Sequence, residues 1–401
     1  MSKALEGIRV LDLSQFEAGP SCTEFLGFLG ADIIKIEPPG KGDQGRKSNR
    51  DKFTREKDWD SWFFVFLNAN KRSVTMNLKS PEAVDMLKAM VKKCDVIISN
   101  YTPGTMEKFG VGYDVLSKIN PGIVYVECSG FGKGGPYSKY PAFDQVAKAA
   151  GGILSDTGEP GGPPCNPGPN VGDTGSGIHM AAAILAALLQ RTRTGEGQAI
   201  DMGLTDNAIN LNRSPIANTQ IDQQPIIRSG CRNPRSPPND IYPCKGGGPD
   251  DYIFIFGVNH YERLMKFIGR PDLCTPDLVD WLDNRNARLD ELHQAIAEWT
   301  IQRDKMTAFH ELARAGVPCG PVLNTVEVMN DPHFIQRGMI VEIEHPHRGK
   351  IKIPGCPVKM SKSDATYTPA PLLGQHNEEI YQEFFGYSKE EVAELKEKNV
   401  I

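Results

Sequence analysis

The stretch that decides the fold is IRVLDLSQFEAGPSCTEFLGFLGADIIKIEPPG, residues 8–40. Residues 8–13 form a short apolar strand pattern, and Gly19-Pro20 opens a helical stretch with apolar side chains. Residues 32–37 form a second strand, which is closed by two prolines and a glycine. A strand, a helix and a strand within about thirty residues make a βαβ unit, which favours a parallel sheet with both faces covered.

The same alternation continues through the first 200 residues. Further apolar runs predict strands at 73–78, 95–99, 122–128 and 198–202, with helices from 81, at 113–119 and at 174–190. We therefore predict a doubly wound α/β domain. The charge-dense stretch 41–60 has no periodicity and is interpreted as a solvated, mobile loop.

The remainder predicts a smaller second domain. The polar stretch 214–238 is interpreted as an interdomain linker. A strand at 251–257 precedes three helical segments, a hairpin and a charged C-terminal helix, at 259–268, 287–300, 304–315, 339–353 and 389–398.

Composition excludes several classes of protein. The chain has 401 residues, 39% hydrophobic and 24% charged, as in ordinary globular proteins. A net charge of −5 gives no bulk basic field for nucleic acid or an anionic membrane. No run of 18 apolar residues or signal-peptide pattern is present. Nine scattered cysteines without a CxxC pair argue against disulfides and a zinc site, and we expect a cytoplasmic protein.

The most informative motif is Gly-Asp-Thr-Gly-Ser-Gly at 172–177, where a long apolar helix begins. Asp173 could be the helix N-cap, worth about 1 kcal/mol. It could equally be a carboxylate nucleophile, with glycines that admit substrate and helix N–H groups that stabilise an oxyanion. The motif alone leaves both interpretations open. The glycines of 130–135 formally match a dinucleotide fingerprint, but they lead into Pro136 rather than a helix.

Several segments in order along nearly the whole chain resemble the class III CoA-transferases, the family of formyl-CoA and carnitine CoA-transferases. They are GIRVLDLSQFEAGPSCTEFLGFLGADIIKIEPPGKGD (7–43), NANKRSVTMNLKS (68–80), NYTPGTMEKFGVGYD (100–114), SGFGKGGPYSKYPAFDQVAKAAGG (129–152), VGDTGSGIHMAAAILAALLQRTRTGEGQ (171–198), GVPCGPV (316–322) and APLLGQH (370–376).

The resemblance implies a Rossmann-like large domain and a smaller α+β domain in an interlocked dimer. The corresponding division is a large CoA-binding domain at 1–213, a linker at 214–240, a small domain at 241–330 and a C-terminal segment, 331–401, that returns to the large domain. It also implies that Asp173 is the nucleophile, which carries CoA as an aspartyl-CoA thioester between an acyl-CoA donor, such as succinyl-CoA, and a carboxylic acid. The CoA thioester is a substrate, and no permanently bound cofactor or metal is expected.

Positions that match the family's CoA-binding and active-site positions are Met76, Lys79, Asn100, Tyr101, Thr102, Lys108 and Asp144. Lysines could pair with phosphates, and Tyr101 could lie against adenine. Glu17 stands where formyl-CoA transferases place a glutamine. We favour a protonated Glu17 that donates a hydrogen bond, or else a side chain that points away.

At three places the sequence departs from related enzymes, and these departures bear on which substrate the protein uses. Pro38 stands where formyl-CoA transferases carry an arginine. The four-glycine loop of formyl-CoA transferases is also missing, with only Gly246–Gly248 nearby, which argues against formyl and oxalate exchange. Phe143 stands where related acyl-CoA racemases carry a catalytic histidine. Residues 15–23 most resemble succinyl-CoA:benzylsuccinate CoA-transferase subunits, which pair two homologous chains. A homodimer and a hetero-oligomer both remain open, as do a racemase and a non-catalytic subunit.

Overall fold

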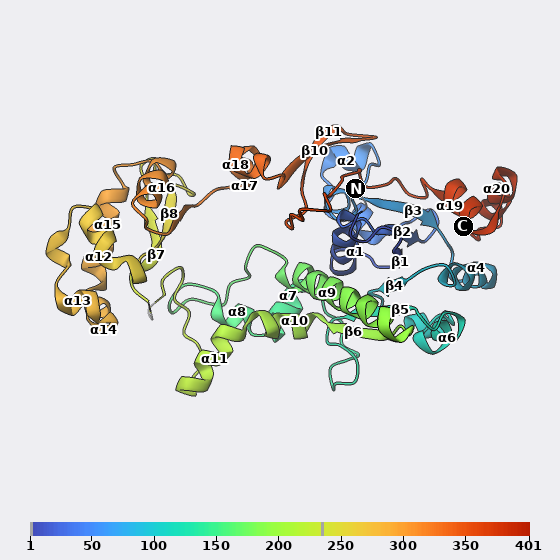
Figure 1. Cartoon of the computed structure of the whole chain (residues 1–401), viewed down its shortest axis with the longest axis horizontal. Helices are drawn as coiled ribbons and strands as arrows, with labels where there is room; N and C mark the ends of the chain where they lie inside the picture. Colours follow the sequence, from blue (N-terminus) through green and yellow to red (C-terminus); the bar gives the residue numbers. More distant parts are fainter. Residues whose placement is uncertain (1–2, 234–235) are drawn as a thin grey trace. The chain divides into compact units, whose positions relative to one another are not determined.

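The structure is a computed structural model that describes residues 3–233 and 236–401 (Figure 1). Residues 1–2 of the predicted large domain and 234–235 of the predicted linker lie outside the described part. The chain divides into two compact units. The first comprises Met1–Leu154, Asn166–Gln224 and Gln336–Ile401, and the second comprises Ser155–Cys165 and Pro225–Ile335.

The first unit is built on a six-stranded, entirely parallel sheet, as the βαβ pattern predicts. Its strand order is β3-β2-β1-β4-β5-β6, the order of a doubly wound Rossmann-type sheet. In register, Val10 of β1 lies opposite Ile33 of β2 and Val96 of β4. The strands are β1 (Arg9–Asp12), β2 (Asp32–Glu37), β3 (Lys71–Thr75), β4 (Val96–Ser99), β5 (Val124–Ser129) and β6 (Ala199–Gly203).

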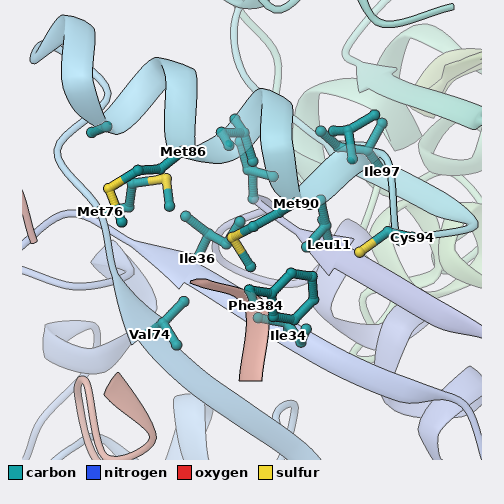
Figure 2. Close-up of a cluster of buried hydrophobic side chains, with 14 of the residues drawn as sticks. Leu11, Ile34, Ile36, Val74, Met76, Met86, Met90, Cys94, Ile97 and Phe384 are labelled. Carbon is teal, nitrogen blue, oxygen red and sulfur yellow. The ribbon is translucent and has the colours of Figure 1, made fainter. Parts of the chain in front are cut away.

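Alternate residues of each strand face opposite sides of the sheet, and each side is buried by its own helices. On one face Leu11, Ile34 and Ile36 join a core that also includes Met86, Met90 and other buried side chains (Figure 2). The C-terminal segment completes this core through Phe384, so residues 336–401 belong to the first unit. The helices on this side are α4 (Pro81–Val91), α6 (Tyr113–Ile119), α19 (Asn377–Phe385) and α20 (Lys389–Glu397).

The other face carries α1 (Ala18–Phe28) and the long α9 (Val171–Thr194). Two helix axes can approach closely only where side chains are small. At Gly177 a Cβ would lie 2.2 Å from Ser21 Oγ and 2.9 Å from the Ala18 carbonyl oxygen. This glycine of the Gly-Asp-Thr-Gly-Ser-Gly motif therefore serves the packing of α9 against α1. α9 is long and apolar enough to cross a membrane by composition, but half of that window is buried within the protein, as in core helices.

The charge-dense stretch 41–60 is not the solvated loop that its composition predicts. It contains η1 (Gln44–Lys47) and α2 (Lys52–Glu56), and it is followed by α3 (Trp62–Val65). Arg46 is 2% exposed, and its guanidinium lies 2.7 Å from Glu37 and 2.6 Å from Asp60. The prediction fails for Asp43 and Arg46, whose charges are paired inside the fold, whereas most of the other charged residues of the stretch, Lys52 and Lys57 among them, are exposed.

The second unit has a three-stranded antiparallel sheet in the order β7-β8-β9, with its own apolar core. Its strands are β7 (Asn239–Pro243), β8 (Tyr252–Phe256) and β9 (Cys319–Pro321), and its helices are α12 (Tyr261–Phe267), α13 (Pro276–Asp280), α14 (Leu282–Ala287), α15 (Leu289–Thr300), α16 (Lys305–Arg314) and α17 (Thr325–Asn330), with short 3₁₀ turns at Val258–His260 and Pro271–Leu273.

Helices and strands outside these two sheets complete the chain. α11 occupies the first part of the predicted linker, so that part is helical rather than an extended connection. The predicted hairpin is formed by β10 and β11, paired antiparallel. The bounds are α5 (Thr105–Lys108), α7 (Asp144–Ala150), α8 (Ile153–Asp156), α10 (Leu204–Leu211), α11 (Arg213–Asp222), α18 (Pro332–Gln336), β10 (Ile340–His345) and β11 (Gly349–Pro354).

Candidate active site

A cavity of about 370 Å³ opens at the carboxyl ends of the parallel strands, within the first unit. Its walls come from the segments that follow β1, β4 and β5 and from the start of α9. β1 and β4 are the neighbouring strands between which the strand order reverses, and ligands of open α/β sheets bind at this switch point. Among the predicted site residues, Glu17, Asn100, Tyr101, Thr102 and Asp173 line the cavity.

The loop between β1 and α1 is fixed by hydrogen bonds to residues of neighbouring segments. Asn100 accepts a hydrogen bond from the Gln15 N–H at 2.8 Å and donates to the Gln15 carbonyl at 2.7 Å. Phe16 has a φ of 60°, unusual for a non-glycine residue, and its N–H donates to Asp43. The Asn100 side-chain amide is thus occupied in shaping the loop, although the residue still lines the cavity.

Asp173 lies in the first turn of α9, but it is not the N-cap. The helix begins at Val171 and its N-cap is Asn170, whose side chain makes no capping hydrogen bond. The capping interpretation of Asp173 is therefore wrong. The helix starts three residues earlier than predicted, at Val171 rather than Thr174, and the Asp173 carboxyl is half-buried at the cavity wall.

The acceptor that replaces a cap comes from another helix. Asp144, at the start of α7, accepts the N–H groups of Gly172 at 2.8 Å and Asp173 at 3.2 Å through its Oδ1. These are the donors that a capping side chain normally satisfies. A Cβ on Gly172 would lie 2.8 Å from the same Oδ1, so glycine is required for this approach. Both N–H groups are therefore engaged and cannot stabilise an oxyanion. The prediction that the N–H groups of this helix end do so is wrong for these two.

Glu17 is 6% exposed and faces α9 rather than solvent. Its Oε2 accepts a hydrogen bond from Asn170 Nδ2 at 2.7 Å, and its Oε1 lies 2.7 Å from Thr174 Oγ1, which donates to it. Neither Asn170 nor Thr174 was singled out from the sequence. The chain offers a partial signal for them, since Thr174 belongs to the motif of Asp173 and Asn170 lies four residues before Thr174, one helical turn away.

Three carboxylates thus gather where α1, α7 and α9 meet. Burial, followed by the negative charges of Glu17 and Asp144, raises the pKa of Asp173 to about 7, and Lys148 partly opposes this rise. A carboxylate whose pKa is raised in a cavity is typical of catalytic sites, because proton affinity and nucleophilicity rise together. Lys148 was not predicted from the sequence.

The remaining predicted CoA-binding residues occupy two different places. Met76, Lys79 and Tyr101 line a second cavity of about 200 Å³, and Tyr101 lines both cavities. Met76 is 1% exposed and also belongs to the core, so only its edge faces this space. Lys108, at the end of α5, is exposed and lines neither cavity.

Aromatic side chains form part of the wall of the first cavity. Phe143 is 63% exposed and meets Phe16 edge to face, with ring centroids 6.1 Å apart. Tyr140 also lines this wall. Across residues 3–233 and 236–401, no group of three or more histidine, cysteine, aspartate or glutamate side chains is arranged to hold a metal ion.

Comparison with known proteins decides the family. Residues 5–377 match CoA-transferase family III. The chain belongs to this family. It is 38% identical to a formyl-CoA:oxalate CoA-transferase of Streptomyces coelicolor, with both chains covered completely, and 35% identical to one of Bradyrhizobium sp., of which it covers 98%.

Solved structures of similar proteins agree with the fold. A CAIB/BAIF family protein from Brucella suis superposes with a TM-score of 0.84 at 29% identity, covering 96% of this chain and all of that one. Rv3272 from Mycobacterium tuberculosis gives a TM-score of 0.79 at 28% identity over 94% of this chain and 98% of that one. The predicted fold class and the CoA-transferase class are thereby confirmed.

Proposed function

We propose that this family III CoA-transferase moves CoA from an acyl-CoA donor to a small carboxylic acid through an aspartyl-CoA thioester on Asp173. The observation that carries the proposal is the position of Asp173: a half-buried carboxyl with a raised pKa, in the cavity at the switch point of the sheet. The match of its motif to the family's nucleophile supports the same role. Cys128, the thiol in this cavity, is buried with its pKa raised, which disfavours it as a nucleophile.

The exchange would proceed by covalent catalysis. A carboxylate oxygen of Asp173 attacks the thioester carbon of the donor, the C–S bond breaks, and CoA leaves as a thiolate from a mixed anhydride. The thiolate attacks the aspartyl carbonyl, releasing the donor acid and leaving the aspartyl-CoA thioester. The acceptor carboxylate then attacks that thioester, CoA leaves as a thiolate, and a second mixed anhydride forms. The thiolate attacks the acyl carbonyl of this anhydride, which forms the new acyl-CoA and releases Asp173 as a carboxylate. Each step replaces one activated acyl bond by another of similar energy, so ATP is not needed.

The CoA moiety would lie across the second cavity. Lys79 there, and Lys108 on the nearby exposed surface of α5, are expected to pair with phosphates, and Tyr101 is expected to lie against the adenine. Glu17 is proposed to act at the thioester carbonyl. In the structure both of its oxygens accept hydrogen bonds, from Asn170 and Thr174, so a contact with the thioester would replace one of these two.

Donor and acceptor are proposed only by class. The curated relatives are named for formyl-CoA and oxalate, whereas Pro38 and the missing glycine loop favour other acids, including succinate donors and aromatic or dicarboxylic acceptors. A screen with formyl-CoA, succinyl-CoA and acetyl-CoA against such acids, read by mass spectrometry, would distinguish these.

A covalent trap tests the nucleophile. With donor acyl-CoA alone, borohydride should reduce an aspartyl-CoA thioester at residue 173 to the alcohol, as peptide mass spectrometry would show. Asp173→Asn should take up no label and lose transferase activity while remaining folded. An active preparation without label at this residue would exclude the proposed intermediate.

A racemase and a non-catalytic subunit are the alternatives. Phe143 offers no base at the position of the racemase histidine, so we expect no exchange of deuterium from solvent into the α-carbon of an acyl-CoA. Incorporation would favour the racemase. If the isolated chain is inactive but gains activity with a homologous partner chain, it is a subunit of a hetero-oligomer.

We also propose a dimer whose chains are interlocked, acting in the cytoplasm. Large apolar side chains are exposed along three successive helices, α9, α10 and α11: Ile178, Leu189, Ile209, Leu211, Ile216 and Ile221. An apolar face of this kind is typical of a surface that another chain covers. Light scattering should give a mass about twice 44.1 kDa for a homodimer, and an active monodisperse monomer of 44.1 kDa would refute it.

A further inference from the structure

Lys148 is a charged side chain with no exposure at all, on the same face of α7 as Asp144. Its Nζ lies 2.6 Å from Asp144 Oδ2 and donates to the carbonyl oxygens of Pro167 at 3.3 Å and Pro169 at 3.2 Å. Two hydrogen bonds to carbonyl oxygens and an ion pair with Asp144 thus surround the ammonium group. A fully buried ammonium is costly unless it is paired in this way.

The contacts of Lys148 lead directly to the backbone of the proposed nucleophile. Asp144 uses one oxygen for Lys148 and the other for the N–H groups of Gly172 and Asp173. Pro169, held by the same ammonium, accepts the N–H of Val171, the first residue of α9. Lys148 therefore contacts the first turn of α9 by two routes, through the Asp144 carboxylate and through the Pro169 carbonyl.

The groups that surround Asp173 are mostly acidic, and Lys148 is the cation that offsets them. Glu17 faces it from α1, Asp144 and Lys148 from α7, and the Cys128 thiol from β5. Among the groups of the described residues that act on the pKa of Asp173, Lys148 is the cation. Without it, Asp173 would face the carboxylates of Glu17 and Asp144 with no positive charge to oppose them.

We propose that Lys148 is a positioning residue for the proposed nucleophile: it holds the Asp144 side chain against the first turn of α9, and thereby keeps Asp173 oriented beside one compensating cation. This inference rests on the proposed role of Asp173. A purely structural ion pair between two residues of α7 is the alternative, and it would affect stability without affecting the titration of Asp173.

Charge removal in three combinations separates the two interpretations. Lys148→Gln removes the cation but keeps two donors for the proline carbonyls, so Asp173 should titrate about 1 pH unit higher. Asp144→Asn removes the anion but keeps an acceptor for the N–H groups, so Asp173 should titrate at lower pH. The double variant removes both charges, and Asp173 should titrate near its wild-type position.

The readout is the carbon-13 titration of labelled aspartate carboxyls, with Asp173→Asn identifying the signal, and it needs no enzymatic activity. The low-pH limb of kcat/KM should move in the same directions, about tenfold in rate at a fixed acidic pH for Lys148→Gln. Lys92→Gln, which removes an exposed charge at the end of α4, should leave both readouts unchanged.

Opposite shifts in the single variants, cancelled in the double variant, support the proposal. Single variants that leave the titration of Asp173 in place, or move it in the same direction, overturn it. If Lys148→Gln does not fold, Lys148→Arg must preserve the wild-type titration and the double variant must titrate as stated, or the proposal fails. Correct shifts in a protein without transferase activity would refute the proposed function while supporting the coupling itself.

Discussion

Asp173→Asn should stabilise the protein in alkaline solution and leave its stability unchanged in acid. Burial and two neighbouring carboxylates raise the pKa of Asp173 from 3.8 to about 7, so the folded protein binds this proton more tightly than the unfolded chain does. As pH rises between these values, the unfolded chain loses its proton first, and the free energy of unfolding falls. Above about pH 7 the loss is complete and amounts to at most about 4 kcal/mol, at 1.36 kcal/mol for each pKa unit. The neutral asparagine avoids this cost.

Urea unfolding of both proteins at about pH 5 and about pH 8.5 measures the difference. Between pH 5 and pH 8.5 the advantage of the variant over wild type should grow by at most about 3 kcal/mol, because about two pKa units of the wild-type loss lie in this range. Asparagine has nearly the same shape as aspartate, so the part of the difference that does not depend on pH should be small. Asp114→Asn is the matched control, since Asp114 also lies in the first turn of a helix, α6, but is exposed. A stability difference between Asp173→Asn and wild type that is the same at both pH values would show that Asp173 ionises normally, and would remove the electrostatic argument for the site.

Four further outcomes follow from the same geometry. The kcat/KM of the transferase should fall about tenfold per pH unit below about pH 7, because the protonated Asp173 carboxyl is not a nucleophile; a rate that is flat down to pH 5 would contradict this. Glu17→Gln should retain activity, because the amide can still donate to the thioester oxygen, whereas Glu17→Ala should lower kcat by ~10- to 1000-fold, the scale of one lost oxyanion donor; wild-type turnover of the alanine variant would exclude Glu17 from the site. Gly177→Ala should cost about 1–3 kcal/mol in urea unfolding, because its Cβ would meet the Ala18 carbonyl, while Ala182→Ser on the exposed side of α9 should cost far less. Lys79→Ala should raise the KM for acyl-CoA several-fold with little change in kcat, and an unchanged KM would place CoA elsewhere.

The parallel sheet could be predicted because its strands are short apolar runs bounded by turn residues. Residues 8–13 and 32–37 each alternate between two buried faces, and the helix between them is bounded by Gly19-Pro20 and Gly30. Such local patterns need no knowledge of distant contacts. The stretch 41–60 was mispredicted for the opposite reason: buried pairs such as Arg46 with Glu37 have the same composition as a hydrated surface.

In the site, too, local patterns could be predicted and contacts between distant residues could not. Asp173 was singled out from its motif, but its place in the helix was mispredicted, because the acceptor that caps α9 lies 29 residues earlier in the chain and no local pattern links the two. Lys148 was missed although its spacing of four residues from Asp144 was visible. That spacing usually marks an exposed surface pair, and only the packing of α7 shows that this one is buried.

The cap supplied by Asp144 has a consequence for protein engineering. A helix with its own capping residue can be transplanted as a cassette, whereas α9 begins correctly only beside α7. Grafting the Gly-Asp-Thr-Gly-Ser-Gly hexapeptide onto another Rossmann-type sheet would carry over the carboxyl but not its orientation or its proton affinity. The smallest portable unit is the α7 turn, the intervening prolines and the start of α9 together, and variation in this family would be constrained to change them in concert.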